Sequence, residues 1–238
     1  MEGSNRNHSV AVLVSGGLDS LVLLDQCART HAAVFPLYVR GGLAWERPEL
    51  YWLRRFLAAR PGPPARPLAV LDLPAGDLYG DHWSVTGAGV PGYFAHDSEC
   101  YLPGRNILLL AKAGVYCARH EIPVVAMAQL KGNPFPDSTP RFRRSLAGAF
   151  SLGLDFRLRI ITPFLRFTKP QVIRRGRHLP LHLTFSCMRP ADRRHCGVCT
   201  KCAERRNAFA ASDVPDRTRY AAGPPTRRPA ASRGAYAY

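Results

Sequence analysis

The stretch VAVLVSGGLDS, residues 10–20, joins an all-apolar run to a glycine turn. An apolar run as short as residues 10–14 is typical of a parallel strand that is buried on both faces. Apolar residues then recur at helical spacing through residues 20–31. This order predicts the first strand, loop and helix of an α/β fold, with the loop at the strand end where ligands bind.

The turn itself has the chemistry of a phosphate-binding loop. Gly16 and Gly17 allow a tight turn and the close approach of an anion, while the helix that follows offers free N–H groups and the positive end of its dipole. The motif lacks the lysine of a Walker loop and the spacing of the dinucleotide fingerprint. Asp19 would repel a phosphate, so we expect it to hold a magnesium ion or to brace the loop. An ordinary glycine turn is the alternative.

The rest of the chain alternates strand and helix signals. Further strands are expected at residues 33–39, 68–73 and 123–128, and helices at 49–60, 106–120 and 203–211. Asn106 is expected to cap the second of these helices, and Thr168 with Gln171 resembles a capping box that starts another. The pattern predicts a Rossmann-like parallel sheet with helices on both faces and a small C-terminal zinc-binding part.

We divide the chain into four parts. They are an N-terminal extension at 1–9, an ATP-binding α/β domain at 10–180, a zinc-binding helical module at 181–211, and a disordered tail at 212–238 that is rich in Pro, Ala and Arg. The long, poorly patterned segment 74–104 is typical of a lid or a binding loop.

Four cysteines near the C-terminus have metal-ligand spacing. Cys187, Cys196, Cys199 and Cys202 form the pattern C-x8-C-x2-C-x2-C. Four thiolates suit tetrahedral zinc in a closed structural site. An iron–sulfur cluster is the alternative, although the proline that follows the last ferredoxin cysteine is absent here. Cys27 and Cys117 are expected in the core, and Cys100 receives no assignment.

Composition limits the class of protein. The 238 residues carry a net charge of +16 but only four lysines, and we find neither a secretory signal nor an apolar run of membrane-spanning length. We therefore expect a soluble, cytoplasmic protein without membrane contacts. Nucleic-acid binding is possible but not favoured, because net charge indicates non-specific affinity and the bias toward arginine is also a compositional habit of some genomes.

Taken together, these motifs resemble a known family. SGGLDS at 15–20 matches the PP-loop ATP pyrophosphatases, and four further segments resemble the 7-cyano-7-deazaguanine synthase family. These segments are YLPGRN at 101–106, GNPFPDSTPRF at 132–142, TPFLRFTKPQVI at 162–173 and TFSCMRPADRRHCGVCTKCAERRNAF at 184–209. The resemblance implies that ATP adenylates 7-carboxy-7-deazaguanine and that ammonia then gives the nitrile. It also implies zinc, magnesium and a homodimer.

The resemblance also suggests which residues form the site. Those expected to bind ATP and its phosphates are Val14, Ser15, Gly16, Gly17, Leu18, Asp19, Ser20, Leu21 and Arg105. Asp19, Lys169 and Lys131 are the candidate catalytic residues, with Lys169 in place of the missing Walker lysine. Asp137, Phe135 and Asn106 are the candidate substrate residues. Asp137 would accept the purine amine and ring N–H, with Asp97 and Glu99 as alternatives and a turn-capping role as the simpler explanation.

One segment departs from the family. The string YGQRH that usually follows the second strand reads YVRGGLAWE at residues 38–46. A diverged enzyme that acts on another carboxylate, or on a deazapurine destined for DNA or protein, is therefore an alternative. An RNA-modifying PP-loop enzyme such as a tRNA thiolase is another, supported by the charge of +16. A nucleotide-binding module without turnover is the third.

Overall fold

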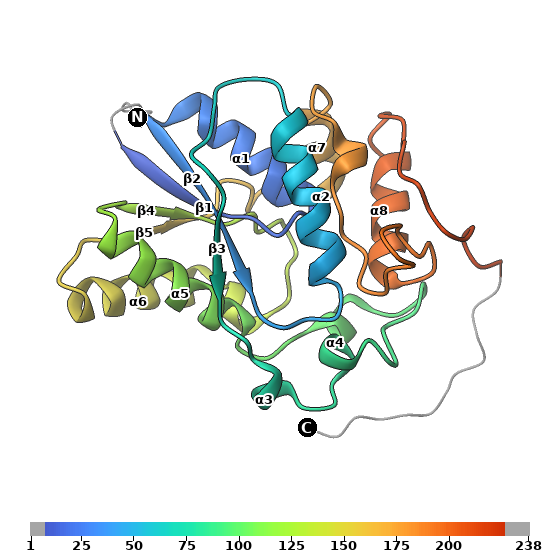
Figure 1. Ribbon diagram of the computed structural model, residues 1–238, viewed down its shortest axis with the longest axis horizontal. Helices are drawn as coiled ribbons and strands as arrows, with labels where there is room; N and C mark the ends of the chain where they lie inside the picture. The colour runs from blue at the N-terminus through green and yellow to red at the C-terminus, as the bar shows by residue number, and fades with distance from the viewer. Residues whose placement is uncertain (1–7, 227–238) are drawn as a thin grey trace.

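The computed structural model describes residues 8–226, which form one parallel sheet covered by helices on both faces (Figure 1). The strands lie in the order β3–β2–β1–β4–β5, and all are parallel to their neighbours. Their bounds are β1 Ser9–Leu13, β2 Ala33–Arg40, β3 Ala69–Asp72, β4 Val124–Ala126 and β5 Arg159–Ile161. The fold class predicted from the sequence is confirmed.

The apolar run at the start of the chain becomes the middle strand, and both of its faces are buried. Val10 and Val12 pack in the core on one side of the sheet, whereas Ala11 packs in the core on the other side. Successive side chains of a strand point to opposite faces, so a central strand needs apolar residues at every position. This is why an unbroken apolar run, and not an alternating one, begins the fold.

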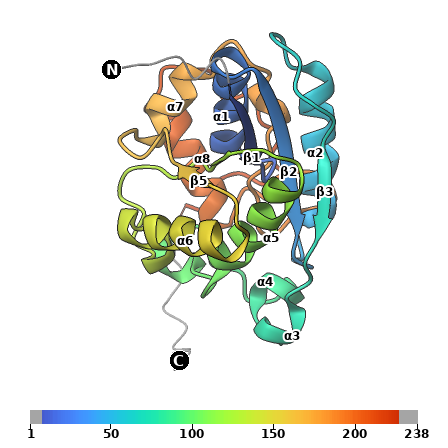
Figure 2. The same ribbon diagram turned by 90° about the vertical axis from the view of Figure 1, so that its left-hand side faces the viewer.

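Three helices cover one face of the sheet and two cover the other (Figures 1 and 2). α1 Leu18–Thr30, α2 Glu46–Ala59 and α7 Lys169–Arg175 share the first core, and α5 Arg105–Arg119 and α6 Pro140–Gly153 share the second. α8 Thr200–Ala210 packs beside α7. The short helices are α3 Gly76–Tyr79, α4 Trp83–Thr86, η2 Asp97–Cys100, η3 Pro136–Ser138 and η4 Leu181–Leu183. No helix between residues 8 and 226 is both long and apolar enough for a membrane span.

Most of the expected elements are present, with their ends shifted by a few residues. The fourth strand ends at Ala126 and not at Ala128, and α2 begins at Glu46, ahead of Pro48. The expected capping box at α7 is confirmed, since the Thr168 backbone N–H donates to Gln171 Oε1 at 2.8 Å. The sequence analysis did not predict α6 and β5. Arginines and glycines interrupt the apolar pattern of α6, and β5 has only three residues.

The start of α5 differs from the expectation. Asn106 is not the cap; the cap position is Gly104, in the left-handed region at φ +71°. The carboxylate of Asp137 instead accepts hydrogen bonds from the Asn106 backbone N–H at 3.0 Å and from its side-chain amide at 3.1 Å. Asp137 is 5% exposed, so a buried residue 31 positions away anchors the first turn of α5.

The C-terminal part shares the main core with the sheet. Leu181, Ala208 and Phe209 pack in the same cluster as α1 and α2, so the boundary expected at residue 181 runs through this core. Disorder was expected from residue 212, but residues 212–226 have defined contacts. For example, Ala221 N–H donates to His195 O at 2.7 Å. The rest of that tail, residues 227–238, and residues 1–7 of the expected N-terminal extension lie outside the described residues.

The anchor of α5 gives a stability prediction. Replacing Asp137 with Ala should lower the free energy of unfolding by about 1–2 kcal/mol, the usual cost of losing a helix cap. Urea denaturation of Asp137→Ala measures this, with Asp81→Ala as the control because Asp81 is exposed. An unchanged denaturation midpoint for Asp137→Ala would contradict the anchoring role.

Candidate functional site

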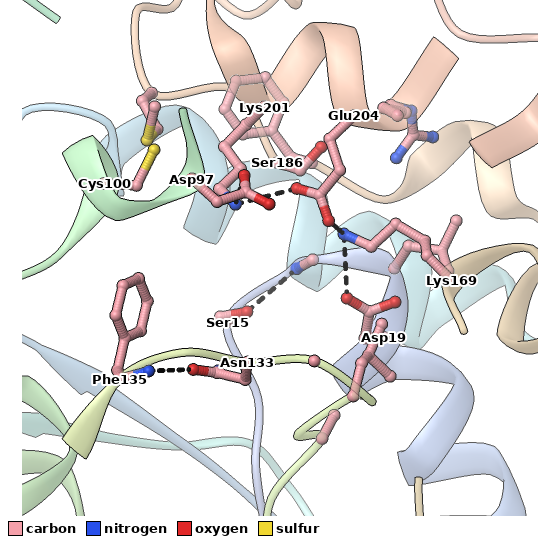
Figure 3. Close-up of a pocket in the computed structure, with 18 of the residues that line it drawn as sticks. Ser15, Asp19, Asp97, Cys100, Asn133, Phe135, Lys169, Ser186, Lys201 and Glu204 are labelled. Atoms are coloured by element: carbon pink, nitrogen blue, oxygen red, sulfur yellow. Dashed lines mark hydrogen bonds and ion pairs between the residues drawn. The ribbon is translucent and has the colours of Figure 1, made fainter. Parts of the chain in front are cut away.

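A cavity of about 460 Å³ opens beyond the carboxyl ends of β1 and β4 (Figure 3). The strand order reverses between these two strands, which is where doubly wound α/β sheets bind ligands. The glycine turn, the segment after β4, the start of α7 and the cysteine-rich part all contribute to its lining. A second cavity, of about 220 Å³, lies toward β2 and α5 and shares Ser15, Asp19 and Glu49 with the first.

The glycine turn is folded by its own serines. Ser20 Oγ accepts the Ser15 backbone N–H at 3.2 Å and donates to Gly17 O at 2.9 Å. Gly16 lies in the left-handed region at φ +73°, and a Cβ there would stand 3.0 Å from Glu49, so this position requires glycine. Gly17 is the N-cap residue of α1, and it has no side chain that could accept a hydrogen bond from the first turn. The first N–H groups of α1 therefore remain available to a ligand.

A chain of alternating charges runs across the first cavity from the glycine turn to α8 (Figure 3). Lys169 Nζ lies 3.2 Å from Asp19 Oδ2 and 2.6 Å from Glu204 Oε1. Lys201 Nζ lies 2.9 Å from Glu204 Oε2 and 3.6 Å from Asp97 Oδ1. Four separate parts of the chain, namely α1, η2, α7 and α8, thus meet through their charged side chains.

These charges shift one another's pKa values. Burial opposes the charged form of Glu204, but Lys169 and Lys201 overcome this and lower its pKa to about 2. Burial likewise opposes the ammonium form of Lys169, yet Asp19 and Glu204 raise its pKa above the usual value. For Asp19, burial is the dominant cause and raises the pKa despite Lys169. Glu204 and Lys169 therefore form a charged pair at neutral pH.

Two buried polar atoms at this cavity have no hydrogen-bond partner among the described residues. They are Asp19 Oδ1 and Ser186 Oγ. A buried acceptor without a partner costs about 1–3 kcal/mol, so such an atom indicates a missing ligand. A carboxylate oxygen is what Mg²⁺ prefers, and Asp19 therefore fits a magnesium ion that accompanies nucleotide phosphates.

Glu49 forms the wall between the two cavities. Its Oε2 accepts the Tyr38 hydroxyl at 2.7 Å, and the side chain is buried. Burial raises the pKa of Glu49 to about 8, although the Tyr38 hydrogen bond opposes the rise. Nearby, Glu46 accepts the backbone N–H groups of Gly41 and Gly42 at 2.6 and 3.0 Å. The segment that departs from the family is thus folded around two buried carboxylates.

Two stacked pairs of aromatic rings contribute to the lining of the first cavity. Phe135 stacks on Tyr101 with ring centroids 4.8 Å apart and 27° between the planes. Trp45 stacks on Trp83 with centroids 5.8 Å apart. Phe135, Trp45 and Trp83 all line the cavity, so a flat heterocycle can enter between apolar faces.

The structure brings most of the predicted site residues together. Lys131, Lys169, Arg105 and Phe135 line the first cavity, and Asn106 and Val14 line the second. Leu21 is fully buried in the core and lines neither cavity. Asp137 also lines neither of them, since its carboxylate is taken up by Asn106. Its role as a purine ligand stays a prediction, one that this geometry does not favour.

Three cavity residues went unrecognised as site residues in the sequence. Glu49 was assigned only to a helix, and neither Lys201 nor Glu204 was expected to line a cavity. Lys201 and Glu204 are three residues apart, so they share one face of α8. That spacing was visible, but the sequence does not show which way the face points.

The four cysteines form a buried cluster. Their Sγ atoms all lie within 4.8 Å of one another, with 3.9 Å between Cys187 and Cys199 and 3.8 Å between Cys196 and Cys202. Four sulfurs about 2.3 Å from a central zinc would be about 3.8 Å apart. The seven cysteines of the chain are all free thiols. The cluster therefore has the ligand number, type and spacing for a tetrahedral metal ion.

Comparison with known proteins identifies the family of this chain. The family model described as "Queuosine biosynthesis protein QueC" matches residues 9–213. The chain belongs to this family. It is 34% identical over 222 residues to a 7-cyano-7-deazaguanine synthase of Anaeromyxobacter sp. (strain Fw109-5), covering 88% of this chain and 94% of that protein. It is 30% identical over 224 residues to the 7-cyano-7-deazaguanine synthase of Brucella ovis, covering 88% and 92%.

Solved structures show more distant similarity. The U34-tRNA thiolase NcsA from Methanococcus maripaludis, solved with its [4Fe-4S] cluster, matches with a TM-score of 0.49 and 13% identity over 90% of this chain and 75% of that one. A 4-thiouridine synthetase in complex with RNA and ATP matches with a TM-score of 0.43 and 13% identity over 87% and 50%.

The raised pKa of Glu49 makes a prediction about pH. Between pH 4.5 and about 8 the folded protein holds a proton at Glu49 that the unfolded chain releases, so this group's contribution to stability falls as pH rises. Glu49→Gln keeps an acceptor for Tyr38 but removes the titration. Its free energy of unfolding should therefore fall less between pH 5 and pH 8 than that of the wild type. Chemical denaturation at both values measures this.

The control is Glu121→Gln, an exposed glutamate outside both cavities. If the wild type and Glu49→Gln lose the same stability between these pH values, Glu49 titrates as an ordinary exposed carboxyl. Burial would then not raise its pKa as stated above.

Proposed function

We propose that this protein uses ATP to convert 7-carboxy-7-deazaguanine and ammonia to the nitrile 7-cyano-7-deazaguanine. In this reaction a carboxylate oxygen attacks the α-phosphorus of ATP and pyrophosphate leaves. Ammonia displaces AMP to give the amide. A second ATP adenylates the amide oxygen, and loss of AMP leaves the nitrile. The observation that carries the proposal is that the glycine loop and aromatic side chains line one cavity at one edge of the sheet.

Support for the use of ATP in this reaction comes from the glycine turn and its surroundings. The uncapped start of α1 offers N–H groups to phosphate, and Lys169, Lys201 and Arg105 line the same cavity. These cations would balance the charge that develops on the leaving pyrophosphate. A magnesium ion held by Asp19 would add further positive charge beside the phosphates.

Support for the acceptor half comes from the cavity walls. Stacking between the Phe135 and Trp45 sides would hold a deazapurine flat. Asp97 also lines this cavity, and its carboxylate could accept the amine and ring N–H of a guanine-like edge. Because Glu49 lies in the wall between the two cavities, it would also be close to both the nucleotide and the acceptor.

We assign zinc to the cysteine cluster, in a structural role. Four ligands fill a tetrahedral site and leave no position for water or substrate. The cluster would therefore supply folding energy and fix the start of α8, whose cap residue is Cys199.

RNA thiolation is the less favoured activity. A thiolase needs a reactive sulfur, but burial raises the pKa of Cys27, Cys100 and Cys117 to about 12, which keeps these thiols protonated. The other four cysteines lie together in one buried cluster that could hold a metal ion.

The reaction is tested by mass spectrometry of the products formed from ATP, ammonium and 7-carboxy-7-deazaguanine. The expected products are the nitrile, AMP and pyrophosphate. Lys169→Ala should lower kcat at least tenfold, which is about 1.4 kcal/mol of barrier. Gly17→Val should abolish binding of a non-hydrolysable ATP analogue in calorimetry, because its side chain would occupy the anion position.

The control is Lys112→Ala, which removes the same charge from a residue outside both cavities. Wild-type protein that binds ATP but forms no nitrile would refute the proposed acceptor. Unchanged analogue affinity in Gly17→Val would refute the phosphate loop.

A further inference from the structure

Glu204 contacts two lysines of the cavity at once. Its Oε1 lies 2.6 Å from Lys169 Nζ, and its Oε2 lies 2.9 Å from Lys201 Nζ. The two lysines come from different helices, α7 and α8, and all three side chains line the cavity (Figure 3). Two ammonium groups this close to one carboxylate would repel each other without it. Glu204 therefore fixes the positions of the Lys169 and Lys201 ammonium groups.

The cysteine cluster fixes the helix that carries Glu204. α8 begins directly after Cys199 and contains Cys202, so two of the four thiols lie at its first turn. The adjacent Arg205 is buried and donates to Thr184 Oγ1 and to Leu181 O, each at 2.8 Å. These contacts hold α8 in the orientation in which Lys201 and Glu204 line the cavity.

The lysine content of the chain also indicates that these ammonium groups have a role in the cavity. The sequence has 33 basic residues but only four lysines. Three of these four, Lys131, Lys169 and Lys201, line the same cavity. A compact ammonium directs three donors from one point and can contact two carboxylates and a phosphate together, whereas a guanidinium spreads its donors over a planar fork. In a chain that otherwise uses arginine, a lysine at these positions indicates that the ammonium geometry is needed.

Glu204 is unsuited to direct phosphate binding, because both oxygens of its carboxylate face lysine ammonium groups. Lys201 has the opposite charge and stands on the far side of Glu204 from Lys169. The pair Lys169–Lys201 thus spans the cavity above the glycine turn, with Glu204 as the link.

We propose that Lys201 is a second cation for the triphosphate of ATP and that Glu204 is the positioning residue that holds Lys201 and Lys169 toward it. The cysteine-rich part then contributes side chains to the nucleotide site in addition to its structural role. This inference rests on the proposed use of ATP but not on the identity of the acceptor.

The test is a double-mutant cycle on nucleotide affinity, measured by calorimetry without any acceptor. Lys201→Met should weaken binding of a non-hydrolysable ATP analogue about tenfold and change AMP affinity less than twofold, because AMP lacks the β and γ phosphates. In the Glu204→Gln background, Lys201→Met should cost less than threefold, because an unanchored lysine contributes little. Lys112→Met, outside both cavities, should bind as the wild type does.

Glu204→Gln also distinguishes positioning from a structural role. It should keep the metal content of the wild type and should lower kcat at least tenfold, with the KM for the carboxylate within twofold. A Glu204→Gln protein that loses its metal would overturn the proposal. So would a tenfold cost of Lys201→Met that persists in the Glu204→Gln background, or an equal loss of AMP and analogue affinity. These binding results are independent of whether the wild type makes the nitrile.

Discussion

The ammonium group of Lys169 joins the two halves of the site. It lies 3.2 Å from Asp19, in the first turn after the glycine loop, and 2.6 Å from Glu204, in the helix that follows the cysteine cluster. Its side chain is only 19% exposed, so solvent screens these pairs weakly. Removing one member would leave charges partly buried and unpaired, which is far more costly than losing a surface ion pair. The cavity therefore depends on all three residues together.

The same junction is supported by the backbone. Phe185 N–H donates to Gly16 O at 2.8 Å, so the segment that leads into the cysteine cluster is hydrogen-bonded directly to the glycine loop. A long segment also reaches the cluster from the other side, because Thr200 N–H donates to Pro91 O at 3.1 Å. The cysteine cluster and the glycine loop are thus joined by backbone hydrogen bonds, although the two motifs are more than 160 residues apart.

The sequence predicts those features that depend on local physics. The apolar run 10–14, the Thr168–Gln171 capping box and the cysteine spacing each carry their signal within a few residues, and the structure contains all three. Features that depend on distant contacts were missed. Asn106 has the chemistry of a cap, but Asp137 reaches it from another element and takes that role, so the carboxylate expected to bind purine is occupied. Glu49 and Glu204 look like ordinary helix-surface residues until the fold turns them inward.

The central claim is that the metal-binding part completes the nucleotide site. Elemental analysis and calorimetry on the same samples, before and after graded removal of metal by a chelator, test it directly. The account predicts about one zinc and no iron per chain at the start, and affinity for a non-hydrolysable ATP analogue that falls in step with the zinc content. A metal-free protein that remains folded and binds the analogue with full affinity would contradict it.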